Sequence, residues 1–117
     1  LKLKTITGDF IKKKIKQKFD AVTLNKVIEH VEDPINFLNK AKKILKPDGF
    51  IYIEVPDAQG AAKYGKYREE FFIEHLHVFS KKSLNYLAKQ LQLKLKHMDT
   101  IREPSNKFSI FAFLEKK

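Results

Sequence analysis

Two kinds of hydrophobic pattern run along the chain, and together they predict five strands and two helices. Apolar and polar residues alternate in LKLKTI (residues 1–6), LKLKHMDTI (93–101) and FSIFAFLEK (108–116), which is typical of strands with one covered face. The mostly apolar runs FDAVTL (19–24) and FIYIEVP (50–56) indicate parallel strands buried on both faces. The segment REPSNK predicts an antiparallel hairpin between the last two strands.

Helical spacing and capping residues predict the two helices. Asp33 suits an N-cap and Pro34 the first helical position, so a helix is expected over about residues 34–45 until KPDG ends it. Ser80 is expected to cap a second helix, whose apolar face carries Leu84, Leu87, Ala88 and Leu91. Residues 10–18 indicate a loop or a short surface helix, and residues 57–79 a long excursion that carries function.

The order of these elements predicts an α/β fold with a mostly parallel sheet and a C-terminal antiparallel hairpin. The 117 residues suffice for one domain, and no repeat or linker divides them. Ligands of such sheets bind outside the carboxyl ends of the strands. Asp9, the segment from Leu24 to His30, Asp57 and Gln59 are expected at these ends, which would explain the place of the Glu29-His30 pair. The alternative is that Glu29 is a first-turn helix carboxylate and His30 a structural hydrogen-bond donor.

Charge and composition exclude several kinds of protein. The net charge of +10 is spread along the chain and predicts a lysine-rich solvated surface. The chain has no Trp and only Arg68 and Arg102 as arginines, which makes nucleic acid an unlikely partner. The absence of Cys excludes disulfides, zinc-thiolate sites and thiol nucleophiles. No membrane-spanning run or signal peptide is seen, so we expect a cytoplasmic protein without a membrane partner.

One long segment resembles a known family. Residues 19–57, FDAVTLNKVIEHVEDPINFLNKAKKILKPDGFIYIEVPD, are similar to the second half of class I S-adenosylmethionine-dependent methyltransferases. Residues 74–99 extend the resemblance to enzymes that modify sugars, quinone precursors and similar small molecules. The resemblance implies a Rossmann-like sheet that lacks its first two strands, S-adenosylmethionine as cofactor, and methyl transfer to a small-molecule acceptor.

The resemblance also implies which residues bind the cofactor. TGDF resembles the segment that contacts adenine, with Asp9 accepting from the exocyclic amine and Phe10 lining the ring. Leu24, Asn25 and His30 are the remaining expected cofactor contacts. The family's Gly-rich loop has no counterpart, and both missing strands would precede Leu1, so residues 1–117 are expected to be the C-terminal portion of a methyltransferase domain. Its sheet would be incomplete, rearranged, or completed by strand exchange or homo-oligomer formation.

The expected catalytic residues lie in the excursion. His75 is the candidate base, flanked by Glu74 and His77, because an imidazole titrates near neutrality. His30, His75 and His77 could instead bind a metal. His75 and His77 could supply two ligands from one strand, but the third would have to come from an unproven spatial neighbour, so no metal site is predicted. Two other classes stay open: a noncatalytic fragment that acts in assembly, and a basic nucleic-acid-binding module.

Overall fold

The computed structural model describes residues 2–72 and 74–117 and contains a single mixed sheet with helices. The elements, in chain order, are β1 (Phe19–Asn25), α1 (Pro34–Lys43), β2 (Leu45–Pro56), α2 (Ala58–Ala62), a 3-10 turn (Glu69–Phe71), α3 (Lys81–Gln90), β3 (Leu93–Arg102) and β4 (Phe108–Lys116). The predicted α/β class is therefore confirmed.

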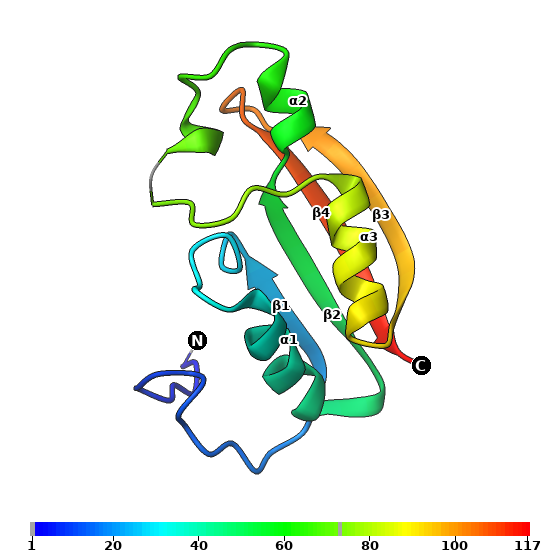
Figure 1. Cartoon of the computed structure of the whole chain (residues 1–117). Coiled ribbons are helices and arrows are strands. Elements are labelled where there is room, and N and C mark those ends of the chain that lie inside the picture. The colour runs from blue at the N-terminus through cyan, green and yellow to red at the C-terminus, as the bar shows by residue number, and fades with distance from the viewer. Residues whose placement is uncertain (1, 73) are drawn as a thin grey trace.

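The strands lie in the order β1-β2-β4-β3 (Figure 1). β1 and β2 are parallel, and β4 is antiparallel to both β2 and β3. Three strands thus point the same way, and the reversed strand β4 lies between two of them. The predicted hairpin is confirmed as β3 and β4, which are paired from Leu93 with Lys116 to Arg102 with Phe108.

Helices α1 and α3 cover one face of this sheet (Figure 1). Alternate residues of β2, namely Ile51, Ile53 and Val55, are fully or almost fully buried on that face. They pack in one apolar core with buried helix residues such as Leu38 and Leu84. The alternating apolar residues of the strands and the apolar faces of the two helices therefore pack together in one core layer, as the sequence predicts.

Both predicted helix starts are confirmed by their caps. Asp33 accepts a hydrogen bond from the Asn36 amide at 3.0 Å, and Pro34 occupies the first turn of α1. Ser80 and Ser83 form a reciprocal capping box at the start of α3. These side chains satisfy backbone donors that have no partner inside the helix.

The strand predicted over residues 1–6 is wrong in the part that the structure describes. Residues 2–7 form neither helix nor strand, and their side chains are exposed. Among the described residues β1 pairs only with β2, so no neighbouring strand offers these residues backbone hydrogen bonds. An alternating pattern forms a strand only where such a neighbour exists.

The segment that follows is attached to α1 instead. Residues 10–18 form a loop, as predicted. The ring of Phe10 lies 4.7 Å from that of Phe37, and the Lys40 ammonium donates to the Ile11 carbonyl at 2.8 Å. The N-terminal part of the chain is thus held by a helix and not by the sheet.

Two further predictions need correction. β1 is an edge strand in which only Leu24 is buried, so it is not covered on both faces. The KPDG segment, expected as a turn, belongs to the irregular start of β2, where the register with β1 shifts between Phe19 and Ala21. The missing neighbour on one side of β1 explains its exposure.

The face of the sheet opposite the helices carries an aromatic ladder. Tyr52 and Phe113 are cross-strand partners with ring centroids 5.1 Å apart, and Phe50 lies 5.8 Å from Phe113. Phe111 continues the row toward His97 on β3, at 5.6 Å. No described helix covers this face (Figure 1), and we call these five side chains the aromatic face.

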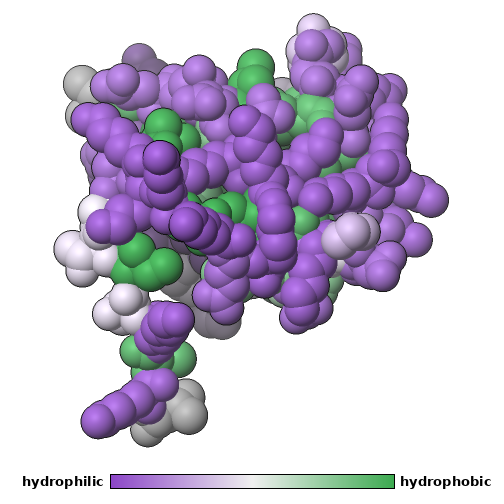
Figure 2. Space-filling model, turned by 90° about the horizontal axis from the view of Figure 1, so that it is seen from below, coloured by the Kyte–Doolittle hydropathy of each residue, from purple (hydrophilic) through white to green (hydrophobic). Residues whose placement is uncertain are grey.

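The surface seen from below is dominated by hydrophilic side chains, as the charge pattern predicts (Figure 2). Some lysines also bind the protein itself. The Lys42 ammonium donates to the carbonyl of Leu91 at the end of α3, at 2.8 Å, and Lys46 binds Asp20. Among the described residues, no helix has the length and apolar character needed to cross a membrane.

Candidate functional site

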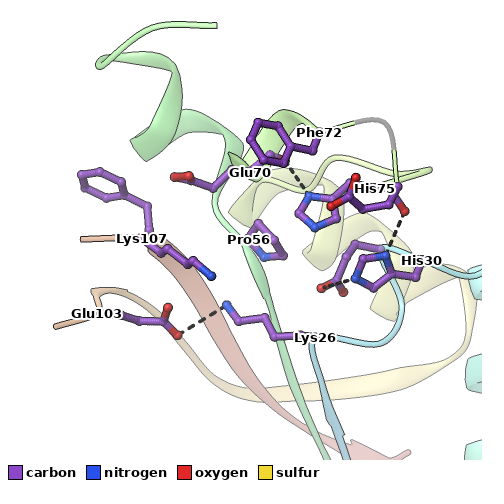
Figure 3. A pocket seen from close by; sticks show the side chains of 11 residues that line it. Lys26, His30, Pro56, Glu70, Phe72, His75, Glu103 and Lys107 are labelled. Atoms are coloured by element: carbon purple, nitrogen blue, oxygen red, sulfur yellow. Dashed lines mark hydrogen bonds and ion pairs between the residues drawn. The ribbon is translucent and has the colours of Figure 1, made fainter. Parts of the chain in front are cut away.

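A pocket of about 270 Å³ opens where β1 and β2 end (Figure 3). Its walls come from the loop after β1, the end of β2, the excursion between α2 and α3, and the turn between β3 and β4. The lining residues are Lys26, Glu29, His30, Pro56, Glu70, Phe72, Glu74, His75, Glu103, Lys107 and Phe108. The site therefore lies at the carboxyl ends of parallel strands, where open α/β sheets bind ligands.

Glu29 is the buried acid of this pocket. Lys26, at a positive φ of 54°, turns the chain out of β1, and its amide donates to the Glu54 carbonyl at 2.8 Å. This turn carries Glu29 inward until its side chain is only 1% exposed. Neither carboxylate oxygen has a hydrogen-bond partner in the described structure. A buried acceptor without a partner is costly, and such groups concentrate at functional sites.

His30 and His75 lie beside Glu29, with their ring centroids 4.8 Å apart. His30 Nδ1 lies 2.8 Å from the carbonyl of Glu74, and His75 Nδ1 lies 2.9 Å from that of Glu70. A carbonyl can only accept, so each Nδ1 carries a proton, and in the neutral form of each ring Nε2 is the acceptor. His30 Nε2 is 3.6 Å from Glu29 Oε1.

The other two predicted catalytic residues take different positions. Glu74 lines the pocket with an exposed side chain, and its carbonyl orients His30. His77 is not part of the lining, because its Nε2 lies 3.2 Å from the carbonyl of Glu32 and its amide donates to that of Glu29. These contacts fasten the excursion to the loop after β1. The catalytic roles of His75, Glu74 and His77 stay predictions.

A partly buried ion pair lies in the wall of the pocket. Arg68 Nε donates to both oxygens of Glu70, at 3.0 and 3.2 Å, and its terminal nitrogen donates to the carbonyl of Asn106. The guanidinium also lies 5.1 Å from the centre of the Phe108 ring, which stacks on Tyr64. Arg68 thereby ties the excursion to the turn between β3 and β4.

Several lining residues were not predicted from the sequence. Lys26 lies between Glu54 and Glu103, 3.5 Å from each, while Lys107 and Phe108 come from the hairpin that the sequence indicated only as a structural turn. Hairpin turns and buried Arg-Glu pairs are common in folded proteins without any site nearby. Only the strand order, which brings β4 beside β2, places the hairpin turn over the pocket.

The predicted cofactor contacts are spread out. His30 lines the pocket, whereas Asp9, Phe10, Leu24 and Asn25 do not. Asp9 Oδ1 accepts from the Ile11 amide at 2.8 Å, and Phe10 packs on α1. Leu24 belongs to the apolar core, and Asn25 is exposed at the end of β1. Their contact with a cofactor stays a prediction.

Comparison with known proteins identifies the family. A family profile described as a methyltransferase domain matches residues 7–98, which is most of the chain. The chain belongs to the methyltransferase-domain family. The matched residues run from before β1 to the middle of β3 and include Glu29, His30 and His75.

Solved structures agree on the fold of this methyltransferase domain. A S-adenosylmethionine-dependent methyltransferase from Clostridium acetobutylicum superposes with a TM-score of 0.75 at 12% identity, covering 99% of this chain and 65% of that one. An O-methyltransferase from neocarzinostatin biosynthesis, in complex with S-adenosylmethionine and 2-hydroxy-5-methyl naphthoic acid, gives a TM-score of 0.68 at 13% identity over 96% and 33%. The Rossmann-like methyltransferase fold is therefore shown.

Curated relatives are similar over a shorter segment. The Haemophilus ducreyi ubiquinone biosynthesis O-methyltransferase is 43% identical over 37 residues, which are 32% of this chain and 16% of that protein. The matched segment is thus about a sixth of this relative, and the chain covers less than two thirds of the solved structures above.

Proposed function

We propose that this domain takes part in S-adenosylmethionine-dependent methyl transfer to a small acceptor that carries a hydroxyl group. The observation that carries the proposal is the pocket at the carboxyl ends of β1 and β2, where Glu29, His30 and His75 converge in a methyltransferase domain. Its volume of about 270 Å³ lies near the lower end for small-molecule sites and suits one ring. The name of the Haemophilus ducreyi relative supports a quinone precursor as that ring.

The residues present fit one end of the cofactor. Asp9 Oδ1 accepts from the Ile11 amide, which leaves Oδ2 to accept from the adenine amine, and Phe10 supplies an aromatic surface. The glycines at positions 8, 49, 60 and 65 form no Gly-rich loop for the methionine end. When bound, the cofactor supplies a methyl group from its sulfonium.

His75 is the proposed base of the reaction. His75 lines the pocket, and Nε2 of its neutral ring can take the proton of an acceptor hydroxyl as the oxygen attacks the methyl group. The Glu70 carbonyl, at 2.9 Å from Nδ1, then stabilises the charged ring. Glu74 and His77 position this segment through their own hydrogen bonds.

The first test is calorimetric titration of the domain with S-adenosylhomocysteine. We expect binding that Asp9→Asn and Phe10→Ala weaken, while Asp99→Asn, which changes an exposed carboxylate on β3, leaves it unchanged. With catechol as the hydroxyl probe, His75→Gln should lower the methyl-transfer rate by about 100-fold or more. Absence of S-adenosylhomocysteine binding would overturn the cofactor part of this proposal.

An assembly role is the second candidate, and two features favour it. The outer edge of β1 has no strand partner among the described residues, and the aromatic face is uncovered. Open edges and apolar faces promote association with another chain. In this role the domain would pair with a second copy and bind no cofactor, so the oligomeric state measured beside the titration separates the two functions.

A further inference from the structure

The unpaired carboxylate of Glu29 is the starting point. It is 1% exposed, and both of its oxygens lack a hydrogen-bond donor in the described structure. A buried carboxylate in this situation gains most from a proton or from a bound cation. Lys26, which also lines the pocket, is instead engaged with Glu54 and Glu103.

The neighbouring imidazoles have hydrogen bonds like those of histidines that bind metals. His30 and His75 each use Nδ1 to donate to a backbone carbonyl, and this fixes the tautomer whose Nε2 is a free acceptor. Ligating histidines in proteins nearly always donate their other nitrogen to a carbonyl or carboxylate in this way. One ligand atom from each of Glu29, His30 and His75 lies within 4.8 Å of the other two.

We propose that Glu29, His30 and His75 bind one divalent transition-metal cation. Ligand atoms around tetrahedral zinc, with bonds of 2.0–2.1 Å, lie roughly 3.3 Å apart. The distance of 3.6 Å between Glu29 Oε1 and His30 Nε2 is close to this value. The ligand atoms lie within 4.8 Å of one another, so His75 needs to approach by at most about 1.5 Å. His75 belongs to the long excursion and not to the sheet.

The ligand set indicates which cations fit. Two imidazole nitrogens and one carboxylate oxygen suit Zn²⁺ and Co²⁺, whereas Mg²⁺ prefers oxygen ligands. Three protein ligands leave a position open toward the pocket, as in metal sites that bind a substrate or water. His77 is not a member of this set, because its ring faces Glu32.

This inference goes beyond methyl transfer and does not depend on it. A bound cation would hold an acceptor oxygen at its open position, and His75 would then act as a ligand instead of a base. Metal binding is measured without cofactor or acceptor, so failure of the metal site leaves the proposed methyl transfer standing, and the reverse also holds.

The test is calorimetric titration of the metal-free protein with Zn²⁺, repeated with Mg²⁺, and visible absorption of the Co²⁺ form. We expect one equivalent of Zn²⁺, much weaker binding of Mg²⁺, and Co²⁺ bands of a four- or five-coordinate site. Glu29→Gln and His75→Gln should each weaken Zn²⁺ binding at least about 10-fold, because each removes a ligand. His97→Gln is the matched control, since that exposed histidine lies on β3.

Glu29→Gln is expected to fold as the parent protein does. Glu29→Gln removes a buried charge without a partner, so the metal-free variant should melt no lower than the parent protein, and its circular dichroism should be unchanged. The proposal is overturned if Zn²⁺ does not bind stoichiometrically, if Mg²⁺ binds equally well, or if His97→Gln weakens binding as much as the two cluster variants do.

Discussion

Tyr52 shows how a single residue responds to its place on the aromatic face. Partial burial, followed by a hydrogen bond to Glu54 at 2.8 Å and the nearby charges of Glu54 and Glu103, raises the pKa of Tyr52 from 10.0 to about 12. Burial and negative charge both disfavour the phenolate.

The raised pKa of Tyr52 predicts a loss of stability at high pH. Below pH 10 the phenol is neutral in both the folded and unfolded chain, and its contribution is fully present. Between pH 10 and about 12 the unfolded chain releases this proton first, so the free energy of unfolding falls as pH rises. Urea unfolding across this range should show a shallower fall for Tyr52→Phe than for the parent protein.

Both proteins contain the same lysines and the same other tyrosines, so a difference between their pH slopes is due to Tyr52. Identical pH slopes for the two proteins would contradict the raised pKa. At pH 7 the variant should lose only about 1 kcal/mol, the usual contribution of one hydrogen bond.

Residues of the site were predictable from the sequence where titratable side chains directly follow a strand. Glu29 and His30 were expected at the carboxyl end of β1 and line the pocket there. The sequence does not reveal that Glu29 lacks a partner, because this depends on how His75 and Glu70 fold over it from more than forty residues away. His77 was expected as a catalytic residue, but its Nε2 lies 3.2 Å from the Glu32 carbonyl and outside the pocket lining.

At the level of elements, the pairing of β1 with β2 depends on Gly49. A Cβ placed there would lie 2.7 Å from the backbone oxygen of Asp20 and 2.8 Å from Leu45 Cδ1. Backbone cannot move aside as a flexible side chain does, so Gly49 permits a close approach at the irregular start of β2.

Substitution of Gly49 should therefore weaken this part of the sheet. Gly49→Ala is expected to lower the free energy of unfolding by about 1–3 kcal/mol, the usual cost of overpacking, as measured by urea denaturation. Gly65→Ala is the contrasting variant: nothing lies within 4 Å of a Cβ there, so any loss of stability reflects its positive φ of 111° and not overpacking. A Gly49→Ala protein as stable as the parent would show that Asp20 and β1 can move.

Elements with local signals were predicted well, and elements that need a distant partner were not. The caps at Asp33 and Ser80 and the spacing after them determine α1 and α3 within a few residues. The alternating residues 1–6 carry an equally clear pattern, but no strand lies beside them in the described structure. Helix signals are contained in the helix itself, whereas a strand also depends on its neighbours.

At the level of the whole molecule, the aromatic face and the open edge of β1 predict self-association. Phe50 is 37% exposed at the rim of this face. The net charge of +10 opposes contact between copies at low salt. We expect sedimentation equilibrium to show dimers that become more abundant as protein concentration and ionic strength rise, because salt screens this repulsion.

A substitution on the aromatic face should remove this association. Phe50→Lys places a charge at the contact surface and is expected to give monomers. Tyr86→Lys changes an aromatic residue that is 65% exposed on α3 and should leave the dimer intact. A parent protein that sediments as a monomer at every concentration and salt would remove the support for an assembly role.

The position of β4 affects how the chain folds during its synthesis. β4 comes last of the four strands in sequence, yet it lies between β2 and β3 and pairs with both (Figure 1). During synthesis, β1, α1 and β2 can pair as soon as they leave the ribosome, but β3 has no place in the sheet until β4 follows. A premature stop in the hairpin would therefore release a split molecule, with the edges of β2 and β3 both exposed to other nascent chains.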